Sequence, residues 1–195
     1  MTVDAARLDR GRIARPNGWW GIAVFVATEA TLFGTIVGTY FYLRFKTPQW
    51  PPAGVPDPKV LVPLLLAVAL VATSVPVQVA YAAARRGRVG PAQLALLFAV
   101  AVQGAYLGIQ IHLFLADLDK FPPDQTAYAS TYFTLVGAHH LHVLVGILLE
   151  VWLLLRLVGG LTNYRLVALQ AATFYWHFVN VLAVVVVLTQ LSPAL

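Results

Sequence analysis

Five long stretches of the chain consist mainly of apolar residues, and shorter polar or proline-rich segments separate them. Each stretch has about the 20 residues that an α-helix needs to cross the hydrocarbon core of a bilayer. We therefore predict an all-α integral membrane protein whose residues 19–195 form a single bundle of five transmembrane helices. The predicted spans are about 19–43, 60–84, 91–115, 129–156 and 164–191.

The composition supports a membrane protein and excludes some kinds of site and partner. Of 195 residues, 59% are hydrophobic and 11% are charged, which is unsuited to a water-soluble domain. The chain has no cysteine, so disulfides and thiolate metal sites are excluded. The 13 basic residues lie between the apolar stretches and form no long run, so we expect no nucleic-acid partner.

The basic residues also predict how the helices cross the membrane. With the N-terminus inside, nine of the 13 lie on the cytoplasmic side, and this excess predicts a cytoplasmic N-terminus and an outer C-terminus. Residues 1–18 are expected to be a cytoplasmic tail, because they lack the apolar core of a signal peptide. The nine are Arg7, Arg10, Arg12, Arg15, Arg85, Arg86, Arg88, Arg156 and Arg165, and the outer four are Arg44, Lys46, Lys59 and Lys120.

Small residues and one proline predict local features of the spans. Small residues spaced by four allow another helix to approach closely. Pro76 lies within the second span, where it should kink the helix or leave a carbonyl for neighbouring groups to satisfy. The helix-packing candidates are Ala30, Gly34 and Gly38 in the first span, and Gly104 and Gly108 in the third.

Polar side chains interrupt four of the five spans at similar depth. A rise of ~1.5 Å per residue places Glu29 and His139 roughly 15 Å from opposite faces of the membrane. Ionisable groups at such depth usually face protein or water. His139 and His142 share one helix face, and we predict that Glu29 bonds one of them. The expected buried polar cluster contains Glu29, Gln103, His139, His142, His177 and Asn180.

The residues leave several roles open for this cluster. It is compatible with a structural hydrogen-bond network, and also with a haem b site, because neutral imidazole is the commonest metal ligand and His142 and His177 lie on different spans. A small transporter that uses Glu29 as its proton site is a third class, although we see no inverted repeat. Glu150 is interpreted as an interfacial residue that pairs with Arg156 or contacts lipid.

Three stretches together resemble subunit III of the haem–copper oxidases. WWGIAVFVATEATLFGTIVGTYFYLR resembles the family's helix with an intramembrane glutamate in a [ST]-E setting. YFTLVGAHHLHVLVG resembles its F-T-L-x-G-x-H-x-x-H-V-x-x-G signature, and FYWHFVNV resembles its Y-W-H-F-V-D-V signature. The order and spacing agree with the family, and the resemblance covers nearly the whole chain.

The resemblance implies a non-catalytic accessory subunit with no cofactor of its own. Such a subunit packs on oxidase subunit I beside other oxidase subunits, which carry the haem and copper. It also holds structural phospholipid and supports sustained proton uptake during O2 reduction by a cytochrome c or quinol oxidase. The implied location is a bacterial plasma membrane. The matching residues are Glu29, His139, His142, Tyr175, Trp176 and His177.

The chain also departs from the family pattern. His140 stands where a small residue is usual, Asn180 where aspartate is usual, and Ala183 where tryptophan is common. Longer members have seven helices and a V-shaped lipid cleft between the first two and the other five. This chain matches from the third helix onward, so we expect a partner to supply one wall or the wall to be missing. The related small subunit of nitric oxide reductases remains an alternative assignment.

Overall fold

The computed structural model describes residues 17–56 and 58–194, and their regular structure is entirely helical. Five spans in it are long and apolar enough to cross a membrane, which confirms the predicted all-α membrane bundle. Residues 1–16 of the predicted tail, with four of its arginines, lie outside the described residues. The helices are α1 (Asn17–Lys46), α2 (Leu61–Ala72), α3 (Ser74–Arg85), α4 (Val89–Leu118), α5 (Ala127–Val158), α6 (Asn163–Leu191) and the short η2 (Ser192–Ala194).

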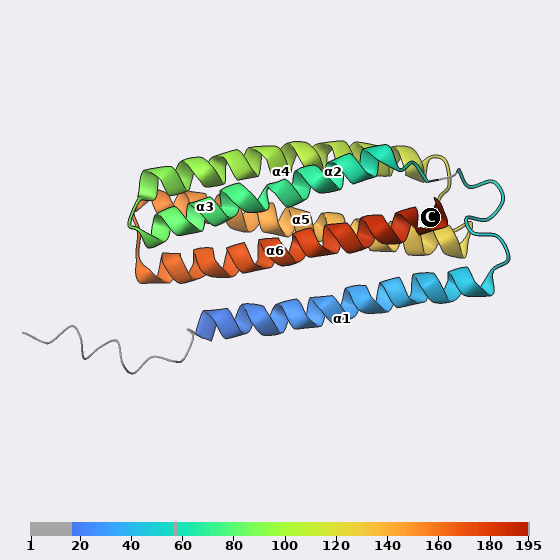
Figure 1. The fold of residues 1–195 in the computed structure, drawn as a ribbon, viewed down its shortest axis with the longest axis horizontal. Coiled ribbons are helices and arrows are strands. Elements are labelled where there is room, and N and C mark those ends of the chain that lie inside the picture. Colours follow the sequence, from blue (N-terminus) through green and yellow to red (C-terminus); the bar gives the residue numbers. More distant parts are fainter. Residues whose placement is uncertain (1–16, 57, 195) are drawn as a thin grey trace, which may run out of the picture.

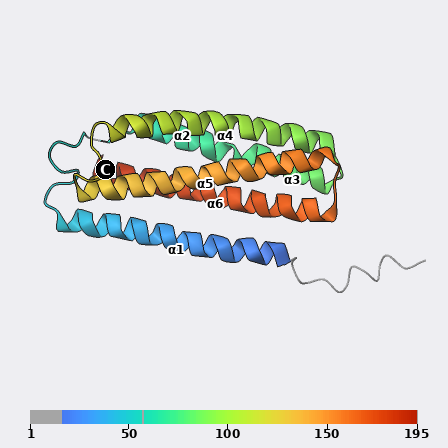
Figure 2. The ribbon, with the colours of Figure 1, turned by 180° about the vertical axis from the view of Figure 1, so that it is seen from behind.

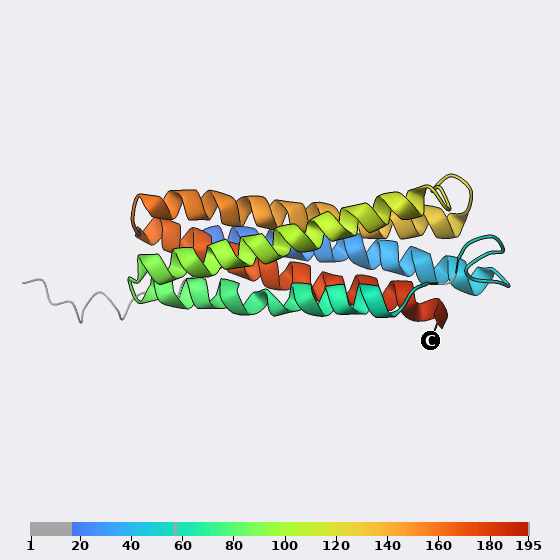
Figure 3. The ribbon, with the colours of Figure 1, turned by 90° about the horizontal axis from the view of Figure 1, so that it is seen from above.

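The helices lie side by side along one axis, and α2 and α3 together form the second span (Figure 1). This second span, α4, α5 and α6 pack as a four-helix bundle, while α1 lies along its side against α5 and α6 (Figures 1 and 2). Figure 3 shows the same bundle from above, with α2, α3 and α4 in front of α1. α1 is therefore attached to the rest of the chain along one face.

Local signals explain where the helices begin and turn. α5 begins at Ala127, two residues before the expected span, because Thr126 caps it: the Thr126 hydroxyl accepts a hydrogen bond from the Ala129 amide at 3.1 Å. The short connection between α3 and α4 reverses the chain at Gly87, whose φ of 71° lies in the left-handed region that glycine adopts without steric cost.

Pro76 interrupts the second span as expected. Proline lacks an amide hydrogen and its ring collides with the carbonyl four residues earlier, which here belongs to Ala72. α2 ends at that residue, Thr73 lies between the helices, and α3 begins at Ser74. The Thr73 hydroxyl donates to the Leu70 carbonyl at 2.5 Å and so satisfies one of the carbonyls at the break.

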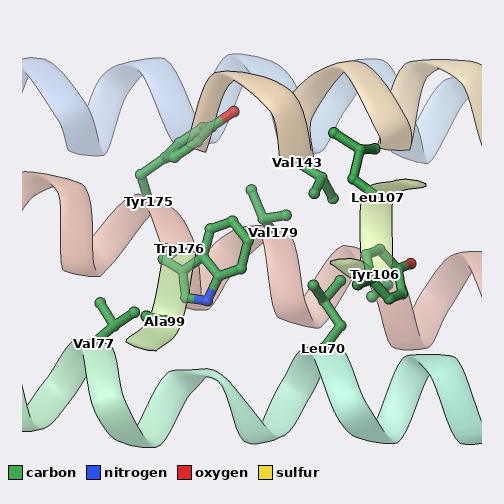
Figure 4. Close-up of a cluster of buried hydrophobic side chains, with 10 residues drawn as sticks. Leu70, Val77, Ala99, Tyr106, Leu107, Val143, Tyr175, Trp176 and Val179 are labelled. Atoms are coloured by element: carbon green, nitrogen blue, oxygen red, sulfur yellow. The ribbon is translucent and has the colours of Figure 1, made fainter. Parts of the chain in front are cut away.

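The side chain of Trp176 of α6 fills the centre of the bundle and is fully buried. Figure 4 shows its indole among apolar side chains from the second span, α4, α5 and α6, with Tyr175 turned to another side of α6. A Cβ on Gly146 of α5 would lie 2.6 Å from Cζ3 of Trp176, closer than packed atoms allow. Gly146 therefore lets α5 and α6 approach at the tryptophan.

The two predicted strips of small residues face away from the bundle. Ala30, Gly34, Gly38, Gly104 and Gly108 are exposed. A Cβ on any of these four glycines would have no described atom within 4 Å. Within the described residues the strips therefore pack no helix of this chain, and a close approach there remains a prediction for another chain.

Candidate functional site

Glu29 of α1 meets His142 near the middle of α5. Oε2 of Glu29 lies 3.0 Å from Nε2 of His142, and the two side chains are 19% and 11% exposed. The other ring nitrogen, Nδ1, lies 2.7 Å from the carbonyl oxygen of Ala138. The rings of Phe33 and His142 pack edge to face, with centroids 5.1 Å apart and an angle of 77° between their planes. Of the two histidines considered for Glu29, the structure thus brings His142 to it.

The hydrogen bond to Ala138 limits the arrangements open to the hydrogen bond between His142 and Glu29. A carbonyl oxygen only accepts, so Nδ1 carries a hydrogen in its bond to Ala138. Nε2 then either accepts from a neutral Glu29 or, in an imidazolium, donates to a carboxylate. Both arrangements place one proton between Nε2 and Oε2, and both leave the pair neutral. The contact is therefore a site for one shared proton between α1 and α5.

His139 does not join this pair. Three residues along a helix separate two side chains by about 60° around its axis, so His139 and His142 face different neighbours. His139 is 3% exposed, and neither of its ring nitrogens has a hydrogen-bond partner among the described residues. It lines a cavity inside the four-helix bundle, together with His140.

Gln103 of α4 pairs with Glu150 of α5 instead of joining Glu29. The Gln103 side-chain amide donates to Oε1 of Glu150 at 3.3 Å, and the two residues are 0% and 1% exposed. This corrects the interpretation of Glu150 as interfacial: it lies eleven residues after His139, hence about 20° away on the same buried face of α5. Arg156 instead lies over the ring of Trp152, 5.8 Å from its centroid.

His177 and Asn180 bond to the break between α2 and α3. The ring nitrogens of His177 lie 3.3 Å from Ser74 Oγ and 3.3 Å from Gln78 Oε1. The Asn180 amide lies 2.6 Å from Ser74 Oγ, and turning it so that both ends are satisfied lets its Nδ2 donate to the Leu70 carbonyl. His177 is thus directed toward α3 and His142 toward α1, so the two histidines considered for haem face different helices.

Sequence reasoning did not single out Thr73 and Ser74, the hydroxyl residues at the break to which these side chains bond. Trp176 Nε1 donates to Thr73 Oγ1 at 2.9 Å, and the hydroxyl of Tyr175 donates to the His142 carbonyl at 3.1 Å. Hydroxyl residues beside Pro76 were the available signal, because freed carbonyls in a membrane helix need donors. The structure therefore divides the expected cluster into the Glu29–His142 pair, the Gln103–Glu150 pair, the groups at the break and His139.

These features define a five-span helical membrane protein whose first and fourth spans are joined by a carboxyl–imidazole contact. Residues 13–191 match the family described as cytochrome c oxidase subunit III, and the chain belongs to this family. It is thus an integral membrane protein of the kind that forms part of a multi-subunit oxidase.

Three relatives illustrate the similarity. The chain is 26% identical over 167 residues to "Cytochrome c oxidase subunit 3" of Thermostichus vulcanus, covering 85% of this chain and 82% of the relative. It is 31% identical over 169 residues to the protein of the same name from Pisaster ochraceus, covering 83% and 64%. It is 29% identical over 174 residues to "Cytochrome bo(3) ubiquinol oxidase subunit 3" of Pseudomonas aeruginosa, covering 85% and 79%. The chain thus spans less than two thirds of some of the relatives it matches.

Proposed function

We propose that the chain is a non-catalytic accessory subunit of a terminal haem–copper oxidase in a bacterial plasma membrane. In this role it binds directly to subunit I, helps the complex sustain proton uptake during O2 reduction, and holds phospholipid. The observation that carries the proposal is the Glu29–His142 contact, in which Oε2 of the carboxyl lies 3.0 Å from Nε2 of the imidazole.

The geometry of this contact suits a supporting role in proton handling. A proton can move between Oε2 and Nε2 without changing the charge of the pair, so the membrane interior gains no net charge. Intramembrane ionisable residues are expensive and commonly belong to proton or ion pathways. The contact lies on the side of the bundle where α1 is attached, and not in the core around Trp176.

The electron donor stays open between cytochrome c and quinol. The similar relatives carry names of both kinds, cytochrome c oxidase and cytochrome bo(3) ubiquinol oxidase. On this proposal the haem and copper, and the donor site, belong to other subunits. The departures at Asn180 and Ala183 are what the nitric oxide reductase alternative rests on.

The outer face of α1 supports the lipid and partner roles. Its apolar side chains Val24 and Leu32 are exposed, and the small residues Ala30 and Gly34 leave room for a close approach. In the longer family members, two further helices stand across a lipid cleft. We propose that phospholipid and a partner subunit cover this face of α1.

Co-purification tests the proposed assembly. An affinity-tagged chain, extracted in mild detergent from its native membrane, should bring down an equal amount of a partner subunit. That partner should contain haem and copper. Haem bound by the isolated chain, and lost on changing His142 or His177, would instead favour the haem b alternative. Recovery of the chain with a nitric oxide reductase would favour the alternative that the chain is the small subunit of such a reductase.

A further inference from the structure

A cavity of about 190 Å³ lies inside the four-helix bundle, on a different side of α5 from the Glu29–His142 pair. Residues from α2, α4, α5 and α6 line it. It extends to the end of the bundle where Pro58, Lys59 and Lys120 lie, and it reaches inward to His139. Nothing in the proposed function uses this cavity.

His139 is the unsatisfied group at its inner end. The residue is 3% exposed, and both ring nitrogens lack a hydrogen-bond partner among the described residues. Nearly all buried polar side-chain atoms in proteins have a partner, either from the protein or from ordered water. A neutral imidazole needs one donor and one acceptor, and a water molecule can serve as either.

The lining provides polar groups between the mouth and His139. At the mouth, Asp117 accepts from Lys120 at 3.0 Å and from the Tyr132 hydroxyl at 3.1 Å. Further along, the side-chain amide of Gln110 donates to the hydroxyl of Tyr106 at 3.2 Å. The volume far exceeds the roughly 10–15 Å³ that one water molecule requires, and apolar cavities stay dry where polar ones hold water.

We propose that this cavity is a water-filled vestibule and that its water binds both ring nitrogens of His139. The bound water connects the imidazole with the aqueous phase at the end of the bundle formed by the 47–56 and 119–126 segments, so that His139 exchanges its ring protons with that side of the membrane. The ligand class is water, and an acyl chain or a dry cavity is the competing occupant.

Adjacent residues of α6 provide matched probes in this cysteine-free chain. Ala183 and Val187 line the cavity, whereas their neighbours Val184 and Leu188 face outward and are 43% and 54% exposed. Each neighbouring pair lies at nearly the same depth. A thiol reacts as its thiolate, which forms in water and not in hydrocarbon. Charged thiosulfonate reagents therefore distinguish a hydrated wall from a lipid-facing one.

We expect A183C and V187C to react at least tenfold faster than V184C and L188C. The measurement uses the assembled complex in sealed vesicles, in variants that retain wild-type haem content. The faster reaction should occur only from the side that labels D119C. Equal rates within each pair, or labelling of A183C from the opposite side, would overturn the water-filled vestibule.

A measurement on the unmodified complex covers the case in which the cysteine variants do not assemble. Hydroxyl radicals generated by a short X-ray pulse oxidise side chains that contact water, including buried ones. His139 should be oxidised at a rate closer to that of Tyr132 at the mouth than to that of Trp176 in the dry core. A rate for His139 as low as that of Trp176 would contradict the proposal.

Discussion

A hydrogen bond between Glu29 and His142 requires one proton between Oε2 and Nε2. Without that proton, the lone pair of Nε2 and the negative carboxylate would face each other, because the Ala138 carbonyl keeps the imidazole hydrogen on Nδ1. The pair also links α1 to α5 at a point 113 residues apart in sequence. It is therefore both a structural link and a site that can hold a proton.

At the scale of single residues, we predict that Glu29→Ala destabilises the complex more than Glu29→Gln. Alanine leaves the His142 ring nitrogen without a partner, at a cost of about 1–3 kcal/mol, whereas glutamine keeps a hydrogen-bonding group in its place. Thermal unfolding of the purified complex measures the difference. Thr31→Ala is the control, because the Thr31 hydroxyl is exposed and bonds only its own helix, at the Ala27 carbonyl. Equal unfolding temperatures for the two Glu29 variants would contradict the link.

At the scale of helices, the contact between α5 and α6 depends on a glycine. Gly146 lies in the histidine-rich signature of α5, and the Trp176 ring occupies the space where a Cβ would lie. The exposed Gly104 of α4 faces open space instead. Both glycines sit within long apolar helices, so only the neighbouring atoms distinguish them.

We therefore predict that Gly146→Ala lowers stability and that Gly104→Ala does not. The added Cβ would approach Trp176 at 2.6 Å, and overpacking of this kind costs about 1–3 kcal/mol. At Gly104 the same change adds no clash and removes a residue that weakens helices by roughly 0.5–1 kcal/mol relative to alanine. Thermal unfolding and yield of assembled complex measure both. A Gly146→Ala variant as stable as wild type would show that the ring moves aside at no cost.

The helices themselves could be predicted well from the sequence, because a bilayer fixes both the length and the apolar character of a span. Depth could also be estimated from position, and Glu29 does meet a histidine of the fourth span. The pairing of the polar groups could not be predicted from the sequence, because it depends on which helix packs against each helix face. Gln103 pairs with Glu150, and the signal for this was the position of Glu150 on the same face as His139.

At the scale of the whole molecule, orientation rests on charge. Nine of the 13 basic residues lie at one end of the predicted spans, and four of those nine lie in the tail outside the described residues. The turn between α3 and α4 belongs to the predicted cytoplasmic end, and Asp119 after α4 belongs to the outer end.

We predict that single cysteines at these two places label from opposite sides. In a chain without native cysteine, D119C should react with an impermeant thiol reagent applied from outside, and R86C should not. Disrupting the membrane should make R86C reactive, which controls for a thiol that is merely buried. Labelling of R86C from outside with protection of D119C would reverse the orientation.

The proposed function gives Glu29 a supporting role in an oxidase whose metals lie on other chains. Its most direct test is the turnover of complexes assembled with Glu29→Gln, followed from the first seconds through prolonged O2 reduction, with haem content measured beside it. We predict normal haem content and near-normal initial turnover, followed by activity that decays faster than in wild type or in Thr31→Ala. Near-zero initial turnover with normal haem would place Glu29 in the chemistry itself, and a decay equal to wild type would remove its role in proton uptake.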